Sequence, residues 1–330
     1  MRYIGIDIGG TKCAVVLGDE NCTILKKVSF PTTSFEETFS RLILETEKMG
    51  TCNAIGISCG GPLNSKEGVI ISPPNLPDWR NIEIVKILRN KFGVPVLLKN
   101  DADACALAEW QFGAGKGSEN MIFLTFGTGL GAGLILNGKL YSGTCDTAGE
   151  VGHIRMTESG PVGHGKAGSF EGYCSGGGIS RMGEAFAKEK NVNFYDEDGK
   201  ITAKSIAVAA ENGDNDAIAI YTKCGQMLGK GLSILVDILN PEKIVIGSIY
   251  QRSGHLMANE MKKEMKKECI GQALSACEVV PAELGDNIGD VAAVCVANYT
   301  AFGIKKHLRW LRNSALFCSF EMWKAKQITK

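Results

Sequence analysis

The most informative part of the sequence is YIGIDIGGTKCAVVL, residues 3–17. Its two ends, Tyr3–Asp7 and Cys13–Leu17, are rich in β-branched and apolar residues, and Gly9–Lys12 lies between them as a glycine turn. That order is typical of a β-hairpin. Asp7 therefore ends a strand beside a turn whose backbone N–H groups can approach phosphate oxygens, because glycine has no side chain.

A second glycine hairpin is expected in the middle of the chain. Its strands are Met121–Phe126 and Ala132–Leu136, and its turn is Gly127–Gly131. Either turn alone could be an ordinary hairpin connection, but two of them form a weak internal repeat and predict a duplicated architecture. Neither turn has the P-loop pattern or the dinucleotide fingerprint. The candidate phosphate-binding residues are Asp7, Gly9, Gly10, Thr11, Lys12, Gly127, Thr128, Gly129 and Gly131.

The segments around the hairpins alternate between helical and strand patterns. Helices are expected at 35–49, 82–92, 102–112, 203–212 and 216–239, and strands at 54–58, 94–99 and 243–246. The alternation predicts an α/β protein. Because 330 residues are long for a single core, we expect two domains, residues 1–112 and 113–300. The basic, amphipathic segment 300–330 is expected to pack on the first domain or on a partner subunit.

Composition argues against several classes of protein. Apolar residues at 44% and charged residues at 22% are typical of a globular chain. The 36 basic and 36 acidic residues balance, so neither a nucleic acid nor a membrane is predicted as a partner. The 12 cysteines form no CxxC pair, and Asp7 lies too early for a signal peptide, so we expect a reduced, cytoplasmic protein.

Two groups of polar residues are candidates for chemistry. Asn100 and Asp101 follow a buried strand and open a helix, where a helix cap is the simpler interpretation. The functional alternative is a carboxylate at a strand end that acts as general base for a hydroxyl group. Glu150, His153 and Glu171 lie in a glycine-rich region, and carboxylates and imidazoles are good partners for sugar hydroxyls. His153 by itself is also compatible with a structural role.

Six motifs in order make the sequence similar to the ROK family (repressors, open reading frames and kinases), from about residue 3 to about residue 301. They are Asp7–Lys12, Ser72–Leu76, Asn100–Ala102 with Leu107–Glu109, Gly127–Gly133, Gly149–His153, and Asn240–Pro241 before Ile244–Gly247. The resemblance implies a two-domain actin-like ATPase fold, a duplicated ribonuclease H-like architecture, with the active site in the interdomain cleft.

The resemblance also implies an activity and the residues for it. The expected reaction is that of a glucokinase-like sugar kinase, which transfers a phosphoryl group from ATP with Mg²⁺ to a hexose or N-acetylhexosamine. Asp101 is then the general base, the two glycine loops bind phosphates, and Gly247 borders the adenine. The sugar-binding residues implied are Asn75, Asn100, Glu150, His153 and Glu171. The partners are therefore a sugar and a nucleotide, and a homodimer is the usual state in the family.

The sequence departs from the family pattern at four places. The family's zinc loop, Cys-x-Cys-Gly-x-x-Gly-Cys-x-Glu, reads Val-Gly-His-Gly-Lys-Ala-Gly-Ser-Phe-Glu at 162–171, so all three cysteine ligands are replaced. Ser58 and Ser248 stand where the family has nucleotide-side glycines, and Asp103 stands where it usually has asparagine. These changes leave open how tightly the nucleotide binds and which sugar is used.

Three other functions are consistent with parts of the sequence. A sugar-responsive transcriptional regulator of this family carries a helix-turn-helix ahead of the first hairpin, where this sequence has two residues and no basic DNA-reading face. A catalytically silent sugar-binding or sensing protein would explain the altered glycines. An actin-like ATPase with a non-sugar substrate is the third. An ATPase assay with and without hexoses distinguishes the silent protein from a kinase.

We predict that the protein binds no structural zinc. A closed zinc site needs four ligands, and of the family's ligand positions here, His153, Val162, His164 and Ser169, only the histidines can coordinate. Cys174 could supply a third ligand only if the loop folded back. Elemental analysis of protein purified without chelator should find far less than one zinc per chain, and a chelator should leave the melting temperature unchanged. Zinc near one equivalent would contradict the prediction.

Overall fold

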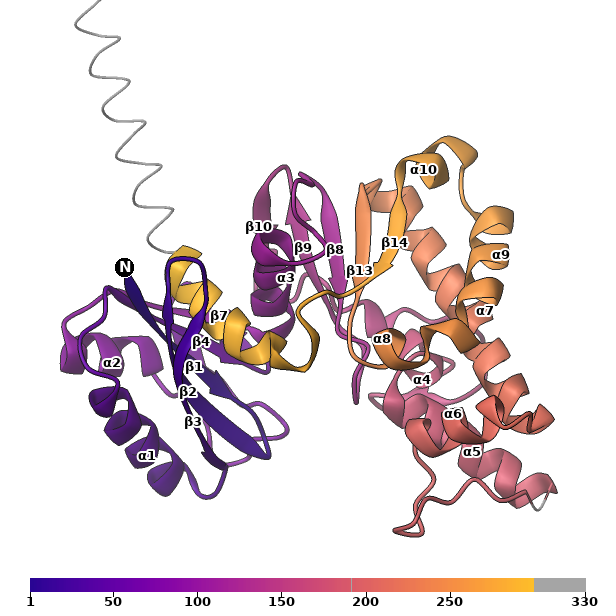
Figure 1. The fold of residues 1–330 in the computed structure, drawn as a ribbon, viewed down its shortest axis with the longest axis horizontal. Coiled ribbons are helices and arrows are strands. Elements are labelled where there is room, and N and C mark those ends of the chain that lie inside the picture. The colour runs from indigo at the N-terminus through magenta and orange to yellow at the C-terminus, as the bar shows by residue number, and fades with distance from the viewer. Residues whose placement is uncertain (191, 300–330) are drawn as a thin grey trace, which may run out of the picture. The chain divides into compact units, whose positions relative to one another are not determined.

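The computed structural model describes residues 1–190 and 192–299, which form two compact units (Figure 1). The first unit is Met1–Lys99 together with residues 293–299, and the second is Asn100–Ala292. The division lies before α3 (Asp101–Phe112), whereas the sequence placed it after this helix, because α3 packs on strands of the second unit. The predicted C-terminal segment, 300–330, lies outside the described residues.

The first unit is built on a five-stranded sheet of order β3-β2-β1-β4-β7. Its strands are β1 (Arg2–Ile8), β2 (Lys12–Asp19), β3 (Ile24–Pro31), β4 (Ala54–Cys59) and β7 (Val96–Asn100). β1 pairs antiparallel with β2 and parallel with β4, which confirms the predicted first hairpin. β3 was not predicted, because its mostly exposed side chains include two lysines and give little apolar signal. Two short strands, β5 (Leu63–Asn64) and β6 (Val69–Ile70), form a separate pair.

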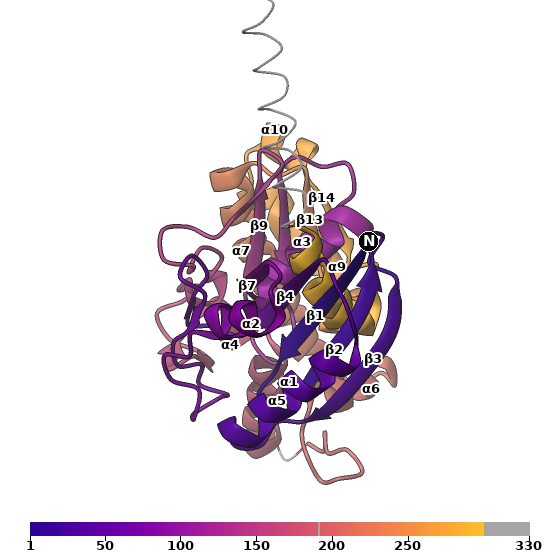
Figure 2. The same cartoon turned by 90° about the vertical axis from the view of Figure 1, so that its left-hand side faces the viewer.

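The two faces of this sheet carry different side chains, because successive residues of a strand point to opposite faces. One face presents the isoleucines of β1 and β4, which pack in a buried core with α1 (Phe35–Lys48) and α2 (Ile84–Phe92). Figures 1 and 2 show both helices on this side of the sheet. The other face is flat where Gly5 and Gly56 lie side by side in the parallel register.

The helical residues 293–299 lie on that flat patch. A β-carbon on Gly5 would come within 2.7 Å of the backbone N of Val294, and one on Gly56 would overlap the backbone N of Ala297. The helix and the two strands therefore meet backbone to backbone. This contact requires glycine because any side chain would push the helix away.

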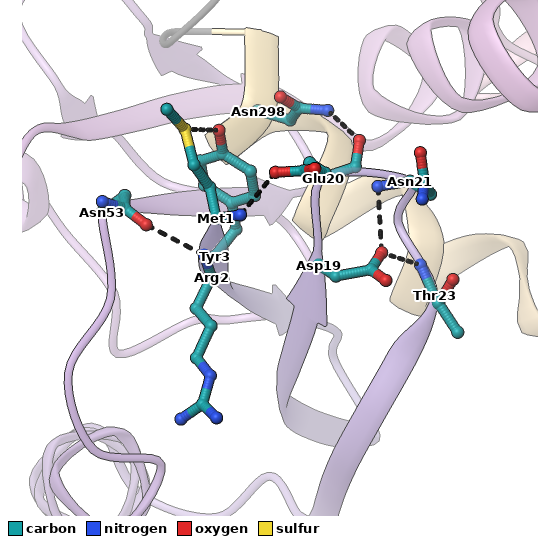
Figure 3. A network of polar contacts seen from close by, with 9 residues as sticks. All are labelled: Met1, Arg2, Tyr3, Asp19, Glu20, Asn21, Thr23, Asn53 and Asn298. Atoms are coloured by element: carbon teal, nitrogen blue, oxygen red, sulfur yellow. Dashed lines mark hydrogen bonds and ion pairs between the residues drawn. The ribbon is translucent and has the colours of Figure 1, made fainter.

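The end of the helix is also held by polar contacts at the β2–β3 turn (Figure 3). The Asn298 amide donates a 3.0 Å hydrogen bond to the carbonyl of Glu20. The turn itself is shaped by Asp19, whose Oδ1 accepts from the backbone N–H groups of Asn21 and Thr23, both at 2.9 Å. The returning helix is thus bound to the same unit by steric fit and by hydrogen bonds.

The second unit repeats this sheet. Its order is β10-β9-β8-β13-β14, with β8 antiparallel to β9 and parallel to β13, so the predicted duplication is confirmed. The strands are β8 (Met121–Leu124), β9 (Ala132–Leu136), β10 (Lys139–Tyr141), β13 (Lys243–Ile246) and β14 (Glu278–Pro281). A small additional hairpin consists of β11 (Val162–Gly163) and β12 (Lys166–Ala167).

Helices complete the second unit. They are α4 (Phe170–Tyr173), α5 (Gly176–Lys190), α6 (Ala203–Glu211), α7 (Asn215–Leu239), α8 (Ile249–Ser253), α9 (Ala258–Glu268) and α10 (Gly271–Ala276). Met261 and Met265 are buried against α7, on the face of α9 opposite its exposed lysines, and Met257 is buried just before the helix begins. α5 was not predicted, because it begins with three glycines, which are poor helix formers. None of the helices in the described ranges has the length and hydrophobicity of a membrane span.

Replacing Gly56 with alanine should lower the free energy of unfolding by about 1–3 kcal/mol, the usual penalty for overpacking. The added β-carbon would meet backbone atoms, which cannot rotate aside. Urea or thermal unfolding measures the effect. Gly60→Ala is the matched control, since a β-carbon there meets nothing within 4 Å. Equal melting temperatures for the two variants would contradict the proposed packing.

Candidate functional site

The first glycine loop, Gly9–Lys12, is closed by hydrogen bonds of its own and by Thr32. The N–H of Gly9 donates to the carbonyl of Lys12 at 3.1 Å. The Thr32 hydroxyl donates to the carbonyl of Gly9 at 2.6 Å, and its N–H donates to the carbonyl of Thr11 at 3.0 Å. Gly10, Thr11 and Lys12 are exposed, so the tip of the turn is open to a ligand. Thr32 was missed because it directly follows β3, a strand that the sequence did not reveal.

Asn75 lies directly on this loop. A β-carbon on Gly10 would be 2.5 Å from the Cβ of Asn75, so the predicted sugar residue and the predicted phosphate loop are neighbours within the first unit. Asn75 is exposed, and the segment that carries it is anchored by buried Leu76 and Trp79. The Trp79 ring packs edge-on against Phe35, with 5.1 Å between centroids, so this tryptophan fills the core and offers no platform for a sugar.

Asn100 and Asp101 meet at the start of α3. Asn100 is the N-cap, and its Oδ1 accepts the N–H of Ala102 at 2.8 Å. Asp101 Oδ1 accepts the same N–H at 2.8 Å. Because Asn100 already caps the helix, a cap alone does not explain Asp101.

The environment of Asp101 changes its acidity. The residue is exposed at the surface, yet the protein atoms around it displace water and raise the pKa of its carboxyl above the ordinary value. The backbone N–H groups of Ala102 and of Asp101 itself act in the opposite direction and are the smaller influence. The result is an accessible carboxylate that holds a proton more readily than a free aspartate.

The second glycine loop is tied to Glu171. The Oε2 of Glu171 accepts the N–H of Leu130 at 3.0 Å, and a β-carbon on Gly129 would lie 2.7 Å from the same oxygen. Gly152 packs against the carbonyl of Leu130, where a side chain would overlap it. The structure therefore brings a predicted sugar residue and the loop Gly127–Gly131 together within the second unit.

His164 lies beside Glu171, and His153 lies beside His164. Glu150 leads into the short 3₁₀ turn η1 (Val151–His153), and both Glu150 and His153 are exposed. The rings of His153 and His164 meet edge to face, with 5.1 Å between centroids. His164 Nδ1 lies 3.6 Å from Oε1 of Glu171. His153 and Glu171 therefore both lie beside the exposed imidazole of His164, so these two predicted sugar-binding residues are close together.

A cavity of about 470 Å³ opens beside the second glycine loop. Its lining includes Gly127, Thr128, Gly176, Lys204, Ser248 and Arg252. The start of α5 supports the loop, because the N–H groups of Gly176 and Gly177 donate to the carbonyls of Gly127 and Thr128 at 2.7 and 3.2 Å. Lys204 and Arg252 give the lining a positive charge. Sequence reasoning missed both, since each lies far along the chain from the loop and belongs to no motif.

The chain is similar to known proteins along most of its length. The ROK family pattern matches residues 3–299. The chain belongs to the ROK family. The glucokinase of Streptomyces coelicolor is 34% identical over 307 residues, which cover 89% of this chain and 96% of that protein.

Two further relatives show the range of the ROK family. The crystal structure of a ROK family glucokinase from Streptomyces griseus in complex with glucose and AMPPNP matches with a TM-score of 0.75 and 31% identity, over 91% of this chain and 100% of that one. The xylose repressor of Bacillus subtilis is 29% identical over 234 residues, 71% of this chain and 58% of the repressor. The predicted actin-like ATPase fold is confirmed by the matching ROK kinase structures.

The residues at the ROK zinc positions have other contacts in this chain. Val162 is exposed on β11. Ser169 is buried and caps α4 by accepting the N–H of Gly172 at 3.1 Å. Cys174 is turned into the core, where its thiol donates to the carbonyl of Cys224 at 3.5 Å. No metal-binding group of three or more His, Cys, Asp or Glu residues occurs in residues 1–190 and 192–299. The zinc content itself remains a prediction.

The two serines that replace glycines of the ROK pattern, Ser58 and Ser248, have different surroundings. Ser58 is buried on β4 and lies opposite half-buried Asp7 in the parallel register. Gly247 donates its N–H to the carbonyl of Leu124 at 3.0 Å, and the cavity lining begins at the next residue, Ser248. Gly247, the predicted neighbour of the adenine, therefore precedes a cavity-lining residue in the chain but is not itself among the lining residues.

Two variants of Glu171 separate its predicted roles. Glu171→Ala leaves the Leu130 N–H without its acceptor and should lower stability by about 1–3 kcal/mol. Glu171→Gln keeps an oxygen for that N–H and should keep most of the stability. Both should weaken the binding of a hexose, measured by calorimetry beside melting curves. Glu189→Ala, on the exposed face of α5, is the control. Equal stability of the alanine and glutamine variants would argue against the anchoring role.

Proposed function

We propose that this chain is an ATP-dependent sugar kinase that phosphorylates a free hexose or N-acetylhexosamine at its 6-hydroxyl. The observation that carries the proposal is Asp101, an accessible carboxylate with a raised pKa at a strand end, where Asn100 already caps the helix. A carboxylate whose pKa is raised toward the working pH is a more effective proton acceptor. The similarity to glucokinases supports the same reaction.

Each unit has exposed polar side chains that are suited to bind a sugar. Asn100 uses its Oδ1 for the helix, so its amide N–H₂ group can donate to a sugar oxygen. Glu150, His153 and Asn75 are exposed, and their side chains can accept or donate to neighbouring hydroxyls. Glu171 would bind the sugar while it holds the second glycine loop, so sugar and phosphate positions would be set by one carboxylate.

Each glycine loop is suited to bind phosphate groups of the phosphoryl donor, and a cavity lies next to the second loop. Backbone N–H groups of a glycine turn suit phosphate oxygens, and Lys204 and Arg252 add positive charge. Asp7 fits a role in holding Mg²⁺, because this ion takes one or two carboxylates and completes its shell with water and substrate phosphates. Half-buried Asp7 supplies such an oxygen ligand beside an open phosphate-binding turn. When bound, Mg²⁺ would neutralise charge on the terminal phosphates.

In the proposed mechanism, Asp101 orients the sugar hydroxyl and accepts its proton as the oxygen attacks the terminal phosphorus. The bond from that phosphorus to the bridging oxygen breaks in line with the attack, and the nucleoside diphosphate leaves. The loops hold the phosphates in place, and the cationic lining stabilises the negative charge on them. Positioning and electrostatic stabilisation supply most of the rate enhancement in this type of reaction.

A second candidate is a catalytically silent sugar-binding or sensing protein. It is favoured by the similarity to xylose repressors and by Ser248, which replaces a nucleotide-side glycine. A coupled kinase assay over a panel of hexoses and N-acetylhexosamines decides between the two. Sugar binding without phosphoryl transfer to any of these sugars would favour the silent protein.

The variant Asp101→Asn should lower kcat by about 10²–10⁴-fold, the usual loss for a general base. Asparagine keeps the size and an oxygen for the Ala102 N–H, so the fold and the sugar affinity should persist. The control is Asp103→Asn, two residues further on the same helix, where the buried carboxylate accepts the Ser142 hydroxyl at 2.5 Å. Near-full turnover in Asp101→Asn would contradict the proposed base.

The pH dependence gives a second readout of the same prediction. Because the pKa of Asp101 is raised, turnover should fall as pH drops through a value above that of an ordinary aspartate. Asp101→Asn should lack this acidic limb. The raised pKa also means that the charged carboxylate destabilises the fold, so Asp101→Asn should gain stability at neutral pH and lose that gain as pH falls.

A further inference from the structure

Ser248 has a backbone conformation that normally requires glycine. It follows β13 and Gly247 and precedes α8, with φ 52° and ψ −106°. Side chains rarely adopt this region because the β-carbon crowds the backbone, and a residue held there is strained. The family resemblance implies glycine at this position, and this chain places a β-carbon there. Strained residues of this kind persist where surrounding contacts hold them, and they concentrate at functional sites.

Side-chain contacts hold Ser248 in this conformation. Its backbone N–H donates to Oε1 of Gln251 at 2.8 Å, and the Gln251 amide donates to the carbonyl of Ala282 at 2.6 Å. Its hydroxyl oxygen accepts from Nη2 of Arg252 at 3.2 Å, and Nη1 of Arg252 lies 3.2 Å from Oδ1 of Asp286. Ser248 and Asp286 together orient the guanidinium group.

Ser248 and Arg252 both line the cavity beside the second glycine loop. The Ser248 hydroxyl lies toward that loop, 3.8 Å from the position of a β-carbon built on Gly127. Because its oxygen already accepts from Arg252, the hydroxyl proton can be donated to a ligand. Arg252 has only donors, and the charged residues named in the lining are Lys204 and Arg252, both cations. The site therefore matches a ligand that presents anionic groups and hydrogen-bond acceptors.

We propose that Ser248 and Arg252 form a recognition pair for the phosphoryl donor, a nucleoside triphosphate, by donating hydrogen bonds to its acceptor atoms beside the second glycine loop. The inference rests on the proposed kinase function and adds the donor-side residues to it. Serine at position 248 supplies a hydroxyl donor, although its β-carbon strains the backbone. The oriented guanidinium group of Arg252 supplies coplanar N–H donors that suit the acceptor atoms of phosphates and of a nucleotide ring.

Direct binding of Mg·AMPPNP, measured by titration calorimetry, tests the pair without an assay of phosphoryl transfer. Ser248→Ala removes the hydroxyl and keeps the strained β-carbon, whereas Ser248→Gly removes both. Each should bind the analogue about tenfold more weakly, the loss expected for one hydrogen bond. Arg252→Gln should bind more weakly still. Ser248→Gly should melt at a higher temperature than Ser248→Ala, because it relieves the strain.

Two controls make the outcome specific. Asn137→Gly changes another residue with positive φ, 53°, in the exposed turn between β9 and β10, and should bind the analogue as the wild type does. Glucose affinity should be unchanged in all variants. Wild-type affinity for Mg·AMPPNP in both Ser248 variants and in Arg252→Gln, or an equal loss of glucose affinity, would overturn the inference and leave the kinase proposal standing. A wild-type protein that binds glucose but not Mg·AMPPNP would overturn both.

Discussion

The hydrogen bond from the Leu130 N–H to the Glu171 carboxylate is the contact on which the site in the second unit depends. It joins the second glycine loop to the segment of predicted sugar residues, and a charged acceptor makes it stronger than a bond between neutral groups. It is possible only because Gly129 and Gly152 have no β-carbons, so that the loop, the carboxylate and the η1 turn can approach closely. The missing side chains at these two glycines and one charged hydrogen bond together determine how the second glycine loop and Glu171 are placed.

The first unit follows the same principle without a charged group. Its central strands present Gly5 and Gly56 side by side, and the helical residues 293–299 lie directly on them. Gly10 allows Asn75 to lie on the first loop in the same way. In each case the absence of a side chain lets one backbone segment approach another, and small substitutions there should have large effects because backbone atoms cannot rotate away.

The segment that carries the zinc ligands in the family pattern is held in this chain by hydrogen bonds between its own residues and by packing against α7. Ser169 caps α4, and Lys166 donates to the carbonyl of His153 at 2.6 Å. Phe170 is fully buried against Gly231 of α7, where its ring occupies the space that a side chain would fill. Burial and local hydrogen bonds thus position Glu171, which follows Phe170 directly and faces the second glycine loop.

The sequence by itself determined the local features: both glycine hairpins, the α/β alternation and Asp101 at a helix start could all be predicted, because each depends on residues close together in the chain. Only the tertiary structure decided the domain boundary before α3, the return of residues 293–299 to the first sheet, the cationic cavity lining of Lys204 and Arg252, and the strained backbone of Ser248. The physical reason is that these features arise from packing and hydrogen bonds between residues far apart in sequence, which leave no periodic signal in the chain itself.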